Sequence, residues 1–108
     1  MGKMSRAKGA RGERAIANIM KKYWPNARRG VGQTRMGSDG ADVEGTPFWV
    51  EVKYGKSPRI QAAIDQANEA TDGRPVIVCS KKDKCDILVT MKLSLFLKIC
   101  IKGMWKNG

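Results

Sequence analysis

The chain has 108 residues and a net charge of +11, with 21 Lys or Arg against 10 Asp or Glu. At this length we expect one compact domain over residues 1–108, burying roughly 65% of the surface of the unfolded chain. The charge favours a polyanionic partner, nucleic acid before an anionic membrane surface. The longest apolar stretch, residues 93–101, contains Lys98 and is too short to span a bilayer, and the N-terminus lacks the apolar region of a secretory signal. We therefore expect a cytoplasmic protein without a membrane partner.

The cysteine and histidine content restricts the chemistry. The chain has three cysteines (Cys79, Cys85 and Cys100) without ligand-like spacing, and it has no histidine. A zinc site and a structural disulfide are therefore not expected. Histidine is also the commonest general base, so any catalysis must depend on carboxylates, lysines or a metal ion.

The basic residues are concentrated near the N-terminus. Residues 1–35 hold ten Lys or Arg and a single acid, Glu13. We predict a flexible basic arm over residues 1–10, followed by a helix from residue 11 to 24 with one apolar stripe formed by Ile16, Ile19, Met20 and Tyr23. Glu13 precedes Met20 by nearly two turns and falls on this stripe. It either joins a site as an acid or serves structure, at the helix N-terminus or paired with Arg14 or a nearby Lys.

The middle of the chain predicts three strands. Residues 28–32 form a first edge strand, residues 41–43 a short second strand, and residues 48–53 a third strand after a turn at residues 45–47. Alternation along the third strand places two groups of side chains on opposite faces: Phe48, Val50 and Val52 on one, Trp49, Glu51 and Lys53 on the other.

Asp42 lies on the short strand, where a tight hairpin brings it close to Glu51. Asp39 and Glu44 are rivals, but Asp39 falls in a glycine-flanked loop and Glu44 lies towards the turn. Two carboxylates and the Lys53 ammonium at one sheet edge are costly unless something uses the charge. A hard divalent cation, Mg²⁺ or Mn²⁺, would use it.

The C-terminal half predicts a helix, two strands and a helix. Ser57 as N-cap and Pro58 as first helical residue predict a helix over residues 57–72, with Gln66 at the border of its apolar stripe, either facing solvent or serving the site. Strands follow at residues 75–79 and 86–90, separated by a solvated basic loop at residues 81–84. The last helix, residues 91–101, carries more apolar surface than a small sheet can cover, which favours a homodimer.

This order, α–β–β–β–α–β–β–α, predicts an α/β fold, a small mixed β-sheet flanked by helices. The helix at residues 57–72 acts as a crossover, so the strand at 76–79 should run parallel to the strand at 48–53.

Asp42 followed by Glu51-Val52-Lys53 resembles the Asp…Glu-x-Lys core of the PD-(D/E)xK nuclease superfamily, with Ala41 in place of the usual proline. Together with Glu13, the basic arm and Gln66, residues 5–80 are most similar to the archaeal-type Holliday junction resolvases. The resemblance implies a restriction-endonuclease-like α/β/α core. It implies a Mg²⁺ (or Mn²⁺) ion held by Asp42, Glu51, the carbonyl of Val52 and Glu13. The implied catalytic residues are Glu13, Asp42, Glu51, Lys53 and Gln66.

The sequence thus predicts a metal-dependent, structure-specific DNA endonuclease of recombination and repair. It would hydrolyse branched DNA, resolving four-way junctions by paired nicks as a homodimer. DNA contacts are expected mainly with the backbone, from Lys8, Arg11, Arg14, Arg28, Arg29, Arg35, Ser38 and Lys56. Arg35 and Ser38 are included because they resemble the substrate-facing loop of the resolvases. Two alternatives stay open: a related endonuclease or nickase acting on duplex or flap DNA, and a non-catalytic basic nucleic-acid-binding protein in which residues 51–53 form ordinary cross-strand ion pairs.

Overall fold

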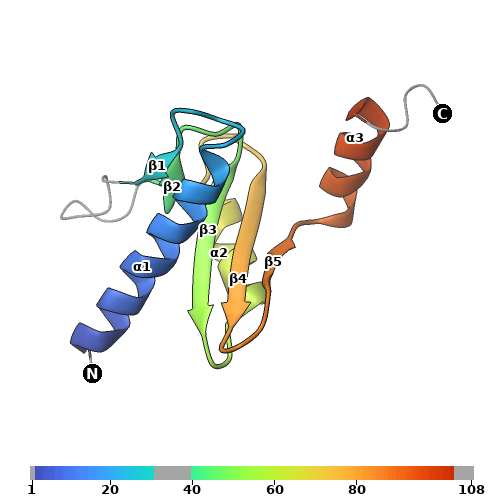
Figure 1. The fold of residues 1–108 in the computed structure, drawn as a ribbon. Helices are drawn as coiled ribbons and strands as arrows, with labels where there is room; N and C mark the ends of the chain where they lie inside the picture. Colours follow the sequence, from blue (N-terminus) through green and yellow to red (C-terminus); the bar gives the residue numbers. More distant parts are fainter. Residues whose placement is uncertain (1, 31–39, 104–108) are drawn as a thin grey trace.

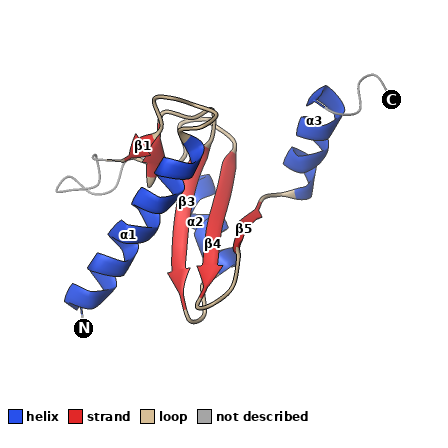
Figure 2. Cartoon of the chain, viewed as in Figure 1, coloured by secondary structure: helices blue, strands red, loops and turns tan. Residues whose placement is uncertain are grey.

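The computed structural model describes residues 2–30 and 40–103, and the side chains of these residues except 2–8, 100, 102 and 103. It is a five-stranded mixed sheet with helices on both faces (Figures 1 and 2). The elements in chain order are α1 (Gly2–Met20), β1 (Arg28–Arg29), β2 (Val43–Glu44), β3 (Trp49–Gly55), α2 (Ile60–Ala70), β4 (Val76–Lys82), β5 (Ile87–Thr90) and α3 (Leu93–Gly103). The predicted fold class and order of elements are confirmed.

The strands lie in the sheet in the order in which they occur in the chain, β1-β2-β3-β4-β5. β2 and β3 form an antiparallel hairpin with Val43 opposite Val50, and Thr46 closes its turn by accepting the N–H of Phe48 at 3.1 Å. β3 and β4 run parallel along their whole length, from Trp49 opposite Val76 to Gly55 opposite Lys82. The predicted parallel pairing is therefore confirmed, because α2 carries the chain from the end of β3 back to the start of β4.

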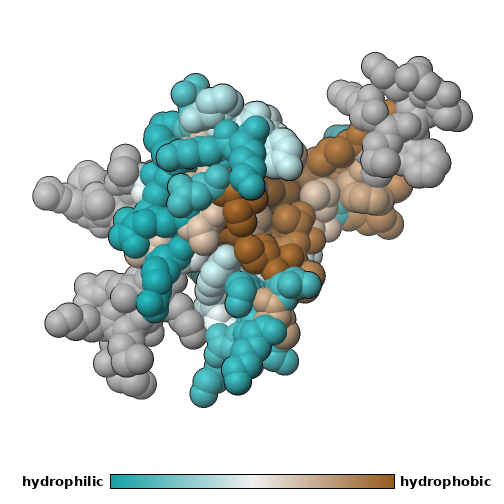
Figure 3. Space-filling model, viewed as in Figure 1, coloured by the Kyte–Doolittle hydropathy of each residue, from teal (hydrophilic) through white to brown (hydrophobic). Residues whose placement is uncertain are grey.

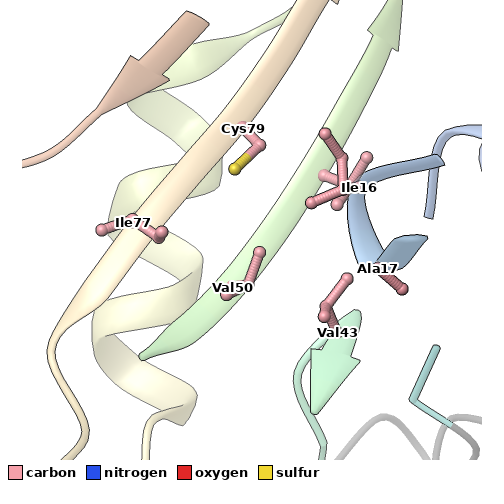
Figure 4. Packing of buried hydrophobic residues seen from close by; sticks show 7 residues of the cluster. Ile16, Ala17, Val43, Val50, Ile77 and Cys79 are labelled. Carbon is pink, nitrogen blue, oxygen red and sulfur yellow. The ribbon is translucent and has the colours of Figure 1, made fainter. Parts of the chain in front are cut away.

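The two faces of β3 belong to two separate cores. Val50 and Val52 pack towards α1 with Ile16 and Ala17 and with Ile77 and Cys79 of β4 (Figure 4). Trp49 packs on the opposite face with Ala67 of α2, and Val78 lies on that face with Ala63 and Ile64. The alternation predicted for residues 48–53 is confirmed, and Glu51 and Lys53 share the α2 face with Trp49.

α1 differs from the prediction at both ends. It is helical from Gly2, where a flexible arm was predicted, and it ends at Met20, so Tyr23 lies beyond it in a turn and is 73% exposed. Its buried residues are Ile16 and Ala17, with Gly12 one turn earlier, while Ile19 is 46% exposed. The buried stripe is shifted towards Gly12 and Ala17, because small residues let the helix approach the sheet closely: a Cβ at Gly12 would lie 3.0 Å from the ring of Tyr54.

Several further boundaries differ. β2 is Val43–Glu44 and not residues 41–43, so Asp42, which was predicted to lie on this strand, lies just before it. α3 runs from Leu93 to Gly103, where residues 91–101 were predicted. α2 begins at Ile60 with Arg59 as its N-cap, so the prediction of Ser57 as cap and Pro58 as first helical residue was wrong. β4 continues to Lys82, so half of the predicted basic loop at residues 81–84 is strand. Parallel pairing with β3, which reaches Gly55, supplies the hydrogen bonds that extend β4 past its apolar residues.

α3 projects away from the sheet on a short connection after β5 (Figure 1). Its apolar side chains are exposed, among them Leu93 at 69%, Phe96 at 48% and Ile101 at 59%. Apolar surface runs from the middle of the body towards this helix (Figure 3). Within the described ranges, no helix has the length and apolar character that crossing a membrane requires.

Gly45 and Gly73 give a matched pair of stability predictions. Both have positive φ, +86° and +109°, but a Cβ at Gly45 would lie 2.1 Å from the carbonyl oxygen of Asn26, whereas one at Gly73 would meet no atom within 4 Å. Gly45→Ala should lower the free energy of unfolding by about 2–4 kcal/mol, and Gly73→Ala by about 1 kcal/mol. Urea denaturation of both variants tests this. Equal losses would contradict the close approach of the β2–β3 turn to residues 26 and 27.

Candidate active site

The outer edge of β3 is open beyond Val50 because β2 is two residues long. Asp42 lies just before β2, where its N–H donates to the carbonyl of Val50 at 2.9 Å. Its Oδ2 accepts the N–H of Val52 at 2.8 Å. The side chain of Asp42 thus continues the pairing that β2 no longer provides, and this holds the carboxylate against the middle of β3.

A cleft of about 460 Å³ opens at this edge, between α1, β3 and α2. It is lined by Gly9, Glu13, Gly40, Asp42, Trp49, Glu51, Val52, Lys53, Tyr54, Gln66, Ala67 and Ala70. All five residues predicted to be catalytic line it, although they come from α1, the start of the hairpin, β3 and α2. Of these five residues, the two farthest apart in the chain, Glu13 and Gln66, are 53 positions apart and still line the same cleft.

Glu51 has the most perturbed environment in the cleft. Burial, together with the negative charges of Asp42 and then Glu13, raises its pKa to about 7, against the lowering effects of Trp49 and Lys53. The indole N–H of Trp49 donates to its Oε1 at 3.2 Å. A carboxyl group that releases its proton near neutral pH, inside a cleft, is typical of a functional site.

Glu13 reaches the cleft but is bound to a cation. Its Oε1 accepts a hydrogen bond from Nε of Arg29 on β1 at 2.7 Å, and its side chain is 13% exposed. The partner is thus Arg29, not the Arg14 or Lys considered from the sequence. In the part of the chain that the structure describes, no three His, Cys, Asp or Glu side chains are arranged to hold a metal ion. Glu13 is close enough to act on the charge of Glu51, but it does not form a three-acid ligand group with Asp42 and Glu51.

Asp42 and Glu51 are the acids best placed to provide metal ligands. The N–H of Val52 points to the edge of β3 that Asp42 occupies, and the N–H and C=O of one residue in an extended strand point to the same side. The carbonyl of Val52 therefore faces the cleft edge as well. Two carboxylates and one carbonyl are a donor set of hard oxygens, which suits Mg²⁺ or Mn²⁺.

The rivals of Asp42 are placed differently. Glu44 forms an ion pair with Arg74 at 2.8 Å and accepts the N–H of Ala41 at 3.0 Å, so both of its oxygens are used within the fold. Asp39 lies outside the described residues. Lys53 and Gln66 both line the cleft, and the charge of Lys53 acts on Glu51.

The predicted DNA contacts divide into three groups. Arg11, Arg14, Arg28 and Lys56 are exposed, and Arg11 lines a second hollow of about 400 Å³ with Tyr54 and Lys81. Arg29 is exposed too, but it is paired with Glu13. Arg35, Ser38 and the side chain of Lys8 lie outside the described residues.

Three residues near the cleft were not assigned a role from the sequence. Trp49 bonds to Glu51, and Arg74 lies over the Trp49 ring, 5.2 Å from its centroid. The ring of Tyr54 lies against Gly12, where a Cβ would be 3.0 Å from it. The position of Trp49, two residues before Glu51 on the same face of the strand, was the one available signal for its contact.

No protein-family model, curated protein or solved structure matches the chain. The functional interpretation of the cleft therefore depends on its own geometry and on the motif in its sequence. The two cysteines whose side chains the structure describes, Cys79 and Cys85, are free thiols; Cys85 is exposed, and burial raises the pKa of Cys79 to about 11.

The pKa of Glu51 predicts how stability depends on pH. The folded protein keeps this proton up to about pH 7, whereas the unfolded chain loses it near 4.5. Between these values the folded state binds more protons, so its stability falls as pH rises and levels off above about 7. Screening by solvent limits the loss to about 1–2 kcal/mol.

Urea unfolding at pH 5 and pH 8 in the presence of EDTA measures this loss. Glu51→Gln should remove most of the decrease in the free energy of unfolding between pH 5 and pH 8 that comes from this cleft. Glu69→Gln, which changes an exposed acid on α2, should retain it. The same decline in Glu51→Gln as in the unmodified protein would contradict the assignment.

Proposed function

We propose that the chain is a metal-dependent DNA endonuclease of the PD-(D/E)xK type, acting on branched DNA and resolving four-way junctions. The observation that carries the proposal is the meeting of Asp42, Glu51 and Lys53 in one cleft, with carboxylates that repel one another in a protein of net charge +11. Such a local negative centre inside a basic surface suits a small cation held next to a polyanion. The free thiols are consistent with action in the cytoplasm.

The donor set fits Mg²⁺ or Mn²⁺. Asp42, Glu51 and the carbonyl of Val52 would hold the ion, with Glu13 acting across the cleft on their charge. Bound there, the ion would supply a Lewis acid that lowers the pKa of a bound water and polarises a phosphoryl oxygen.

Two protein residues would assist phosphodiester hydrolysis beside the ion. A water oxygen bonds to phosphorus as its proton passes to solvent, and the bond to one of the two sugar oxygens breaks as that oxygen takes up a proton from solvent. Lys53 is positioned to stabilise the extra negative charge on the phosphoryl oxygens as this happens. Gln66 offers an amide that orients the phosphate or the water by hydrogen bonding.

Exposed cations around the cleft would hold the DNA backbone. Arg11 and Lys81, with Asp83, line the hollow that shares Tyr54 with the cleft, so the two cations would contact phosphates next to the scissile bond. Arg29 contributes less free charge because Glu13 is already its partner. No base-reading helix is required for recognition of this kind, which follows branch shape and phosphate position.

Junction resolution needs two symmetric cuts, and we propose that a homodimer provides them through α3. The helix and β5 expose most of the large apolar side chains that the described part of the chain leaves in solvent. A second copy would cover these side chains, since two identical apolar helix faces can pack against each other about a two-fold axis.

Loss of the proposed ligands should abolish cleavage and spare binding. Asp42→Asn and Glu51→Gln should each lower the rate of Mg²⁺-dependent nicking by at least about 10²-fold, with junction affinity nearly unchanged, because affinity depends on Arg and Lys. The assay compares a four-way junction, a linear duplex and a flap. Asp65→Asn, at an exposed acid bonded to Gln61 on α2, is the control and should cut normally.

The substrates separate the possible outcomes. Paired nicks selective for the junction support the proposal, whereas preferential cutting of duplex or flap DNA indicates a related endonuclease. Binding without any cutting, in Mg²⁺ and in Mn²⁺, would leave a nucleic-acid-binding protein and refute the enzyme.

A substitution at Arg11 tests whether this residue contacts a DNA phosphate. Arg11→Ala should reduce the slope of log Kd against log salt by about 0.9, which corresponds to one duplex phosphate contact. Lys22→Ala, at an exposed cation beyond the other end of α1, should leave the slope unchanged. Titrations of a fluorescent junction at several salt concentrations give both values, and equal slopes for Arg11→Ala and the unmodified protein would show that Arg11 makes no such contact.

A charge on α3 tests the dimer. Phe96→Glu should convert a dimer to a monomer in sedimentation equilibrium and turn paired nicks into unpaired ones. Lys98→Glu places the same acid on the same helix at an exposed charged position and should retain the dimer. A monomer at all concentrations in the unmodified protein would refute the dimer without affecting the nuclease site.

A further inference from the structure

Arg74 lies between α2 and β4 and is held by three groups. Its NH1 donates to Oε1 of Glu44 at 2.8 Å, and its Nε donates to Oδ1 of Asp72 at 2.9 Å. Its guanidinium also lies over the indole ring of Trp49, 5.2 Å from the centroid. Arg74 is not among the residues lining the cleft, so it does not reach a bound ion or phosphate directly.

One set of contacts leads from Arg74 to Asp42. Glu44, held by Arg74 through one oxygen, accepts the N–H of Ala41 through the other at 3.0 Å. Ala41 is fully buried and directly precedes Asp42. The ion pair therefore fixes the backbone from which the Asp42 carboxylate projects towards Val52.

A second set leads from Arg74 to Glu51. The Trp49 ring is 2% exposed and packs against Ala41 and Ala67, with the guanidinium of Arg74 over it. Its N–H donates to Oε1 of Glu51 at 3.2 Å. A ring fixed in this way limits the directions that the Glu51 carboxylate can take.

We propose that Arg74 is a positioning residue that aligns the carboxylates of Asp42 and Glu51 through Glu44 and Trp49. This inference rests on the proposed metal-dependent function. Lysine cannot replace it, because a planar guanidinium bonds Glu44 and stacks on the indole of Trp49 at the same time, whereas an ammonium is a single point charge. Loss of a residue that directly contacts a metal ligand, as Trp49 contacts Glu51, typically changes metal affinity or activity by about 10- to 100-fold.

The test uses Arg74→Lys and Trp49→Phe in the full chain. Arg74→Lys keeps the positive charge and loses the planar guanidinium. Trp49→Phe keeps a packed aromatic ring and loses the indole N–H. Each should weaken Mn²⁺ binding, measured by calorimetry without DNA, by about 10- to 100-fold. Each should lower kcat for nicking by a similar factor while KM stays the same, because phosphate contacts are unchanged.

Two control variants match these changes. Asp72→Asn changes a partner of Arg74 that contacts neither Glu44 nor Trp49 and therefore does not connect Arg74 to Asp42 or Glu51. The side chain of Asp72 is 59% exposed, so Mn²⁺ affinity and kcat should stay near those of the unmodified protein. Trp24→Phe changes an indole that contacts Phe48 and Tyr23 outside the cleft, and it should also leave Mn²⁺ affinity and kcat unchanged. Because Trp49→Phe keeps the ring, its result stands even if Arg74→Lys lowers the unfolding temperature.

The outcomes separate this inference from the proposed function. If the unmodified protein binds Mn²⁺ and nicks DNA, and both Arg74→Lys and Trp49→Phe match it in affinity and kcat, the positioning role is overturned and the nuclease stands. If the unmodified protein neither binds Mn²⁺ nor cuts, both are overturned. Reduced affinity and kcat in the two variants, with silent controls, support the role of Arg74.

Discussion

The hydrogen bond from the N–H of Val52 to the carboxylate of Asp42 is the contact on which the architecture of the cleft depends. β2 begins only at Val43, opposite Val50, and without this bond the outer edge of β3 would present an unpaired backbone group next to Glu51. With it, the strand stays regular while its edge carries carboxylates in place of a neighbouring strand. A short strand thus both completes the sheet and leaves room for the cleft.

The same geometry creates an electrostatic conflict. Glu51 is partly withdrawn from water beside Asp42, and Glu13 adds a third negative charge at longer range. Trp49 and Lys53 reduce the cost, and Arg29 neutralises part of Glu13, but the pKa of Glu51 still rises to about 7. Maintaining such a centre without a use would cost stability for no gain. A divalent cation beside a phosphate would turn the repulsion into binding energy.

The C-terminal part of the molecule leaves apolar side chains exposed to solvent. β5 and α3 expose apolar side chains that the two cores of the sheet do not cover, and α3 stands away from the body (Figures 1 and 3). Leu95 of α3 and Met91 just before it pack against the core that α1 builds on β3, whereas the described residues of the core on the α2 face include none from α3. The residues that line the cleft come from other elements than α3.

The order of the elements, the parallel pairing of β3 and β4, and the shared face of Trp49, Glu51 and Lys53 could all be predicted from the amino-acid sequence. These follow from periodicity and from the length of one crossover, which are local properties of the chain. The folded structure was needed to show that Glu13 pairs with Arg29, that Gln66 lines the cleft, and that Arg74 contacts Trp49 and Glu44. It also decided which stripe of α1 is buried, against the pattern of Ile19 and Tyr23. Each of these depends on how far one element is shifted or rotated against another, and that is set by packing among residues distant in the chain, which no local pattern records.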